Sequence, residues 1–285
     1  MFPSSPHAVS RLRTERLARS SKPFLARGGA HGPRCAGCRL VPSHCLCNLR
    51  PQVPTHAGVC LLMADIEPLK PSNTGWLIAD VVADTFAFGW ARTVVDPALL
   101  TLLADPQWEP FVVFPGEFVA PERVVTERLA GRAPQSSLTT EPTTGLTPHT
   151  TAANAAHAPG TAGTMGNAQG TPRKRPLFVL LDATWPEARK MFRKSPYLDH
   201  LPVLSLQPDQ LSRYRLRRST RDDHFCTAEV AALCLESAGE MRAARTLEVY
   251  LDVFTHHYLQ ARNQLPPDRF SAAHQQLEQL QNALS

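Results

Sequence analysis

The sequence predicts an α/β protein with a mainly parallel sheet and helices on both faces, and three observations lead to this fold class. Of the 285 residues, 43% are hydrophobic and 19% charged, which is enough apolar material for a core. Four short segments are apolar throughout, as strands buried on both faces are. Segments with helical periodicity separate them, and such alternation favours parallel pairing. The four expected strands are 58–63, 111–114, 177–181 and 203–206.

The N-terminal half supplies the first two of these strands. Gly58–Met63 forms the first, and a repeating apolar face then predicts a helix from Asn73 to about Phe88. Phe111–Phe114 forms the second strand, which ends at Pro115-Gly116 because this dipeptide interrupts regular structure.

The C-terminal half continues the alternation. Leu177–Leu181 forms the third strand and leads directly into Asp182. We expect a helix from about Trp185 to Lys194 and then the fourth strand, Val203–Leu206. Two helices are expected near the end of the chain, Ala228–Ser237 and Ala244–Asn263.

Composition divides the chain into parts. Residues 1–33 carry six Lys and Arg against one Glu and lack apolar periodicity, which predicts a disordered basic arm; the same composition fits an organellar transit peptide. Residues 133–172 are rich in Thr, Ala and Pro with a single charge, so we expect a disordered insertion. The other expected parts are a small module at 34–50, a main domain at 51–265 and a C-terminal tail at 266–285.

The positive charge is concentrated in two places. The basic arm accounts for the whole net charge of +5, and the rest of the chain is neutral. Within it, residues 173–221 hold twelve Lys and Arg against four acidic residues. Such a segment predicts an anionic partner such as nucleic acid. A solvated basic face is the alternative that charge alone leaves open.

Four cysteines form a compact cluster, Cys35-x2-Cys38-x6-Cys45-x-Cys47. Four thiolates this close can surround one tetrahedral Zn²⁺, and a segment so short has little else to hold it folded. Because all four ligands come from protein, we expect a structural metal with no open position. A pair of disulfides is the alternative, but nothing in the sequence indicates an oxidising compartment.

Asp182 follows a predicted buried strand, and ligands of such sheets bind at the carboxyl ends of the strands. Thr184 and Glu187 form a capping-box pattern, which predicts that the next helix begins there. A carboxylate beside Trp185 at this position indicates an acid/base site. The alternative is an aspartate that only satisfies loop amides.

Several other classes find no support. No eighteen-residue apolar stretch and no secretory signal are present, so we expect a soluble, cytoplasmic protein that binds no membrane. The glycine-rich dinucleotide, P-loop and zinc-protease motifs are missing. His256-His257 is interpreted as a partly exposed pair and not as a ligand set.

Asp182-Ala-Thr-Trp185, continuing as Pro-Glu-Ala-Arg-Lys-Met191, resembles the signature of the DTW-domain family, whose bacterial members are tRNA-uridine aminocarboxypropyltransferases. The resemblance runs from about Arg34 to Tyr258. Two features depart from the family pattern: Trp76, where a smaller or basic residue is expected, and the insertion. The other similar blocks are Cys35–Cys47, Leu61–Glu67 with Lys70–Gly75, Val113–Gly116, Leu201-Pro202 with Ser212–Arg217, and Cys226–Glu229.

The resemblance implies a SPOUT-like fold, in which the C-terminal part of the sheet can form a knot. It makes the main domain catalytic, with S-adenosylmethionine as the donor and tRNA as the acceptor. The 3-amino-3-carboxypropyl group would pass to N3 of a uridine in the tRNA variable loop (position 47), releasing methylthioadenosine. The module at 34–50 would hold a structural zinc, and the sequence does not indicate an oligomeric state.

The resemblance also implies roles for individual residues. The expected catalytic residues are Asp182, as general base, with Thr184 and Trp185. The expected donor pocket comprises Phe114, Pro115, Gly116, Leu206, Tyr214, Thr227 and Glu229. The expected substrate-binding residues are Glu67, Asn73, Thr74, Arg189, Lys190, Arg213, Arg215, Arg217 and Arg218. The expected zinc ligands are Cys35, Cys38, Cys45 and Cys47.

Other functions remain open at this point. A SPOUT methyltransferase would use the same donor on RNA but transfer the methyl group. A noncatalytic, zinc-dependent RNA-binding protein would not need Asp182. Asn73 and Thr74 could simply cap a helix, and the arginines could lie on the surface without a partner.

Overall fold

A computed structural model describes residues 7–21, 24, 32–126, 174–206 and 225–283. These residues belong to one compact unit, which continues on both sides of segment 132–173. The expected insertion at 133–172 lies outside the described residues. So does segment 207–224, and the expected knot therefore stays a prediction.

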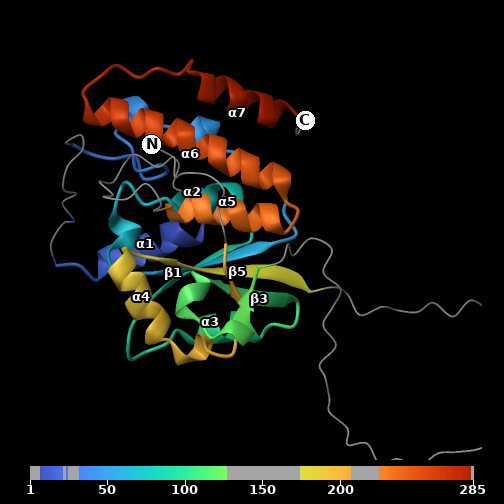
Figure 1. Ribbon diagram of the computed structural model, residues 1–285. Helices are drawn as coiled ribbons and strands as arrows, with labels where there is room; N and C mark the ends of the chain where they lie inside the picture. Colours follow the sequence, from blue (N-terminus) through green and yellow to red (C-terminus); the bar gives the residue numbers. More distant parts are fainter. Residues whose placement is uncertain (1–6, 22–23, 25–31, 127–173, 207–224, 284–285) are drawn as a thin grey trace, which may run out of the picture. The chain divides into compact units, whose positions relative to one another are not determined.

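The described strands form a single six-stranded sheet in which every pairing is parallel (Figure 1). Their order is β2-β1-β5-β3-β6-β4, which confirms the expected α/β fold with a parallel sheet. The strands are β1 (Gly58–Met63), β2 (Thr85–Gly89), β3 (Trp108–Val113), β4 (Val124–Val125), β5 (Arg175–Asp182) and β6 (Val203–Leu204).

Helices cover both faces of this sheet (Figure 1). One apolar cluster packs α2, α5, α6 and α7 over one face, and a second packs α3 and α4 against the other. No described helix has both the length and the apolar character needed to cross a membrane. The helices are α1 (Ala8–Ala18), α2 (Gly75–Val81), α3 (Pro97–Ala104), α4 (Trp185–Arg193), α5 (Thr227–Ser237), α6 (Met241–Arg262) and α7 (Ala272–Asn282).

The topology places the end of β5 at a switch point of the sheet. From β1 the chain turns to β2 on one side, and it then crosses to β3 on the far side of β5. Asp182, the last residue of β5, pairs with Met63, the last residue of β1. Ligands of open α/β sheets bind outside the carboxyl ends at such a point.

The helix expected from Asn73 to Phe88 is wrong in its second half. Helix α2 ends at Val81, and Thr85–Gly89 forms β2, an edge strand paired with β1. The helical pattern continued through this segment, but β-branched and aromatic residues also fit a pleated surface. Pairing with β1 decides the conformation, and Phe86 then packs against Trp108, with ring centroids 6.0 Å apart.

Part of the expected disordered arm is helical. His7 caps α1 by accepting a hydrogen bond from the Ser10 amide, and Val9 and Leu12 are buried. The arginine-rich sequence of α1 has little amphipathic character, so its helical state depends on contacts with β2 and α2 that local patterns do not reveal.

The expected C-terminal tail contains α7, which packs against α6 (Figure 1). His257 is fully buried and its Nε2 lies 2.8 Å from Nε2 of His274 on α7. Its Nδ1 lies 3.0 Å from the carbonyl oxygen of His44, in the cysteine segment. The interpretation of His256-His257 as a partly exposed pair is therefore wrong for His257, which joins three segments.

Candidate active site

Asp182 is the point where three distant segments of the chain meet. The residue is only 2% exposed. Its Oδ1 accepts a hydrogen bond from the Thr227 hydroxyl, and its Oδ2 accepts one from the Asn73 amide, both at 2.7 Å. Hydrogen bonds to a charged acceptor are strong, so these two contacts fix the orientation of the carboxylate. The strand-end position predicted for Asp182 is confirmed.

Asn73 connects this carboxylate to helix α2 and to a second buried acid. Its Oδ1 accepts a hydrogen bond from the Trp76 amide at 3.2 Å, which caps the start of α2. Its Nδ2 also lies 3.4 Å from Oε2 of Glu67, which is fully buried and pairs with Lys70 at 2.5 Å. Asn73 thus caps the start of α2 and contacts Asp182, and its expected role in substrate binding stays a prediction.

Gly75 allows α2 to approach the carboxylate. A Cβ atom at this position would lie 2.6 Å from Oδ2 of Asp182 and 3.3 Å from Oδ1 of Asn73. Real Cβ atoms essentially never come as close to another atom as 2.6 Å, so any side chain here would force Asp182 or the start of α2 to move. Gly75 was not predicted as a site residue, because only the fold brings it to Asp182.

Helix α5 begins beside the same carboxylate. Thr227 is its first residue, and the Ala228 amide donates to Oγ1 of Thr74 at 3.2 Å. The Glu229 carboxylate accepts a hydrogen bond from the Cys226 amide at 2.7 Å and so caps the helix. The expected donor-pocket residues Thr227 and Glu229 therefore have structural contacts at the start of α5.

The capping box predicted at Thr184 and Glu187 is confirmed, and α4 begins there. The Glu187 carboxylate accepts hydrogen bonds from both the backbone amide and the hydroxyl of Thr184, at 3.1 and 2.5 Å. Trp185 is 40% exposed and stacks on Phe114, with ring centroids 5.5 Å apart. Thr184 thus has a local role at the helix start, whereas Trp185 presents an open ring.

The other expected donor residues lie at the carboxyl ends of β3 and β6. Phe114 is buried below Trp185, and Pro115 and Gly116 follow it. The Gly116 amide donates to Oγ of Ser205 at 2.9 Å, which ties the two strand ends together directly before Leu206. Sequence analysis missed Ser205, because no local pattern marks it.

The expected basic residues divide into two groups. Arg189 and Lys190 are exposed on α4, next to the equally exposed Arg193 and Lys194. The remaining expected contacts, Tyr214, Arg213, Arg215, Arg217 and Arg218, lie outside the described residues.

A hollow of about 220 Å³ lies at the same edge of the sheet, beyond the ends of β1 and β2. Ala64, whose amide donates to the Asp182 carbonyl at 3.0 Å, and Lys190 of α4 both line it. Pockets for small ligands usually measure ~300–1,000 Å³, so this hollow is large enough for only part of such a ligand.

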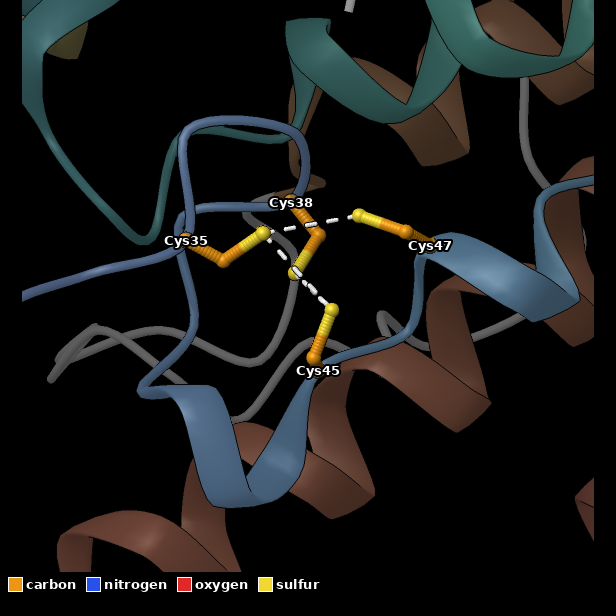
Figure 2. A group of neighbouring side chains, drawn as sticks. All are labelled: Cys35, Cys38, Cys45 and Cys47. Atoms are coloured by element: carbon orange, nitrogen blue, oxygen red, sulfur yellow. Dashed lines mark hydrogen bonds between the residues drawn. The ribbon is translucent and has the colours of Figure 1, made fainter. Parts of the chain in front are cut away.

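The four cysteines of the predicted metal centre come together, with their sulfur atoms facing one another (Figure 2). Three Sγ···Sγ distances are 3.5, 3.6 and 3.7 Å, and all four atoms lie within 4.8 Å of one another. Zinc–thiolate bonds of ~2.3 Å place tetrahedral sulfurs about 3.8 Å apart, so the donor set fits such an ion. Burial raises the pKa of the Cys38 thiol to about 12, which makes a thiolate there unfavourable without a cation.

The cysteine segment is joined to the loop that carries Asn73. Arg39 has a left-handed backbone (φ 66°) and a buried guanidinium that donates to the Lys70 carbonyl at 3.0 Å. The same group lies 4.4 Å from the ring centroid of Trp76, whose Nε1 donates to the Gly37 carbonyl at 3.2 Å. Trp76, the departure from the expected pattern, thus packs against the turn between Cys35 and Cys38.

Buried charged side chains also join the cysteine segment to α2. Burial lowers the pKa of Arg39 to about 9, and it raises the pKa of Asp80 on α2 to about 7. The Arg50 guanidinium lies 2.7 Å from Oδ1 of Asp80, and the Tyr250 hydroxyl of α6 donates to Oδ2 at 3.1 Å. The residues around the cysteines therefore form part of the same core as α2 and α6, so the expected module at 34–50 packs against the main domain.

Comparisons with known proteins agree with this arrangement. A protein named tRNA-uridine aminocarboxypropyltransferase 2, from Drosophila melanogaster, is 37% identical over 68 residues. The match covers 23% of this chain and 27% of that protein, so the chain spans about a quarter of the relative that it matches. No solved structure matches the chain. The DTW domain model, in contrast, matches residues 32–259, a range that contains the four cysteines, the Asn73 loop, Asp182 and the start of α5, and the chain therefore belongs to the DTW-domain family.

Proposed function

We propose that this protein transfers the 3-amino-3-carboxypropyl group of S-adenosylmethionine to N3 of a uridine in the variable loop of tRNA. Membership of the DTW-domain family and the name of the Drosophila relative support this reaction class. The observation that carries the proposal is the position of the signature aspartate. Asp182 ends the central strand at the switch point of the sheet, oriented by Asn73 and Thr227.

The chemistry defines what the site must do. The N3 lone pair attacks the terminal carbon of the aminocarboxypropyl chain, the carbon–sulfur bond breaks, and its electron pair goes to sulfur, which gives methylthioadenosine. The N3 proton leaves to a base. The sulfonium is already a good leaving group, so the protein contributes by placing the chain carbon, and not the methyl group, in line with N3.

In this proposal Asp182 accepts the N3 proton. The Thr227 hydroxyl donates to one oxygen of Asp182, and the Asn73 amide donates to the other. Fixed donors on both oxygens hold the carboxylate in one orientation, which a positioned base needs. The rival role, in which Asp182 only orders the junction, is tested by the pH dependence of a variant described below.

In the proposal the donor and the RNA meet near this carboxylate. Phe114, Gly116 and Leu206, which follow the ends of β3 and β6, provide contacts for the donor. The exposed cations of α4, Arg189 and Lys190, provide contacts for the RNA, because phosphate contacts dominate the affinity of proteins for nucleic acid. Glu67, Asn73 and Thr74 contribute to substrate binding in this proposal, with Asn73 in contact with Asp182.

Zinc is the metal that we propose for the cysteine cluster. Cys35, Cys38, Cys45 and Cys47 would hold it and leave no open position, so the ion would stabilise the fold and not take part in the reaction. Residues 34–50 would then act as a metal-stabilised segment attached to the catalytic domain at 51–265.

Nucleoside analysis tests the proposal. Purified protein is incubated with S-adenosylmethionine and unmodified tRNA, and the digested RNA is examined by mass spectrometry. We expect a uridine carrying the aminocarboxypropyl group and an equal amount of methylthioadenosine. A methylated nucleoside would indicate a methyltransferase, and tRNA binding without any modified nucleoside would indicate a noncatalytic RNA-binding protein; either result would refute the proposal.

A further inference from the structure

Two large aromatic side chains lie exposed and adjacent at the carboxyl edge of the sheet. Phe118, in the turn after β3, is 39% exposed, and Trp185, the first residue of α4, is 40% exposed. Their ring centroids are 5.8 Å apart. Single exposed apolar residues are common, but two neighbouring rings from distant parts of the sequence form a surface suited to another flat, apolar group.

The buried ring of Phe114 and helix α4 hold these two rings in place. Phe114 is 5% exposed and stacks on Trp185 at an interplanar angle of 16° and on Phe192 of α4 at 4°, with centroids 4.3 Å apart in the second pair. Phe118 also contacts Phe114, at 5.9 Å between centroids. Because a buried ring and a helix fix both exposed rings, a ligand that binds them does not have to order them first.

A cation completes this surface. The Arg189 guanidinium lies 4.6 Å from the ring centroid of Phe118, and Arg189 follows Trp185 by one helical turn. Within the described part of the chain, no ion pair joins Arg189, Arg193 or Lys194 to a carboxylate, and all three are exposed. The rings are thus bordered by positive charge that is available to a polyanion.

We propose that Phe118, Trp185 and Arg189 form a stacking platform for an unpaired base of the RNA substrate, next to the uridine that reacts. The inference rests on the proposed function and adds a recognition site to it. Every nucleobase has a π-face that can stack on aromatic rings, and arginine can contact the adjacent phosphate. The loops of tRNA contain unpaired bases, and sequence-specific recognition of RNA mostly depends on such bases.

The charge distribution favours an RNA base over the adenine of the donor. S-adenosylmethionine carries a positive sulfonium. The exposed cations Arg189, Lys190 and Arg193 of α4, with Lys194 directly after it, would repel this charge, whereas they attract phosphates. Phe118 lies outside the set of residues that the family resemblance assigned, so this site is a specific addition to them.

Substitution of Phe118 tests the platform. Alanine substitution of a stacking residue weakens single-stranded nucleic acid binding by about 5- to 150-fold, so we expect Phe118→Ala to raise the Kd for tRNA within this range. Phe118→Tyr keeps the ring and should restore binding, and a change in a purely structural residue would not show this pattern. Phe270→Ala is the matched control, because Phe270 is 85% exposed in the segment between α6 and α7.

Binding is measured by fluorescence anisotropy with labelled tRNA, and donor binding by calorimetry on the same proteins. Unchanged tRNA affinity in Phe118→Ala would overturn the proposal. Weakened donor binding with unchanged tRNA affinity would overturn it as well and assign the platform to the adenine of the donor. Both assays work without turnover, so a wild-type protein that makes no aminocarboxypropyl nucleoside would refute the proposed function without affecting this test.

Discussion

Substitution of Gly75 by alanine tests the packing of the site around Asp182. A Cβ at this position would lie 2.6 Å from Oδ2 of Asp182, whereas ordinary contacts begin at 3.4 Å. The start of α2 and the carboxylate would therefore have to separate by about 0.8 Å. The hydrogen bond from Asn73 to that same oxygen is 2.7 Å long and would be stretched to the limit of such a bond.

The expected magnitude follows from this displacement. A hydrogen bond to a charged group contributes ~1.5–3 kcal/mol, whereas alanine gains at most ~1 kcal/mol over glycine in a helix. We therefore expect Gly75→Ala to lower the free energy of unfolding by ~0.5–2 kcal/mol. Turnover should fall by ~10²-fold or more, because misplacement of reacting groups by about 1 Å has an effect of that size.

Urea denaturation and single-turnover rates measure the two effects. Gly89→Ala is the matched control, because a Cβ at Gly89 would meet nothing closer than 3.7 Å, the Cδ1 atom of Leu12. That variant should be as stable and as active as the wild type. Helix propensity alone predicts that Gly75→Ala is more stable than the wild type and fully active. That result would refute the described geometry around Asp182.

Three further predictions follow from the structure. Asp182→Asn should reduce turnover by ~10²–10⁴-fold, with donor and tRNA binding nearly unchanged. The turnover of this variant should recover partly at high pH, where uridine ionises unaided. Equal losses in calorimetric binding and in rate, without alkaline recovery, would refute the general-base role. Chelation of the metal, or Cys35→Ala, should lower the melting temperature of the whole domain, because Arg39 and Trp76 join the cysteine segment to α2; melting of that segment alone in a calorimeter would contradict this. Burial lowers the pKa of His257 to about 4, so below pH 6.5 the folded state binds fewer protons than the unfolded state. The urea midpoint should therefore fall as the pH drops from about 6.5 to 4. His257→Asn should reduce this fall, and an identical pH profile in the variant would show that His257 does not cause it.

Local patterns predicted the central part of the fold correctly. The apolar run of β5 and the capping box of α4 lie within a few residues of each other, so their positions and the place of Asp182 at the strand end follow from sequence alone. The close Cys35–Cys47 spacing predicted the sulfur cluster for the same reason.

The remainder depends on contacts between distant residues. Asn73 and Asp182 are 109 positions apart, and only the parallel pairing of β1 with β5 brings them together. The strand conformation of Thr85–Gly89 likewise depends on its partner β1. The left-handed Arg39 is held by its contacts with Lys70 and Trp76, which no spacing in the sequence indicates.

The central claim is that the aminocarboxypropyl chain, and not the methyl group, reaches the RNA. S-adenosylmethionine labelled in its carboxyl carbon, and the same donor labelled in its methyl group, distinguish the two in parallel reactions with unmodified tRNA. The account predicts that the carboxyl label enters the tRNA and that the methyl label stays with methylthioadenosine. Entry of the methyl label into the tRNA, or retention of both labels in small molecules, would contradict it.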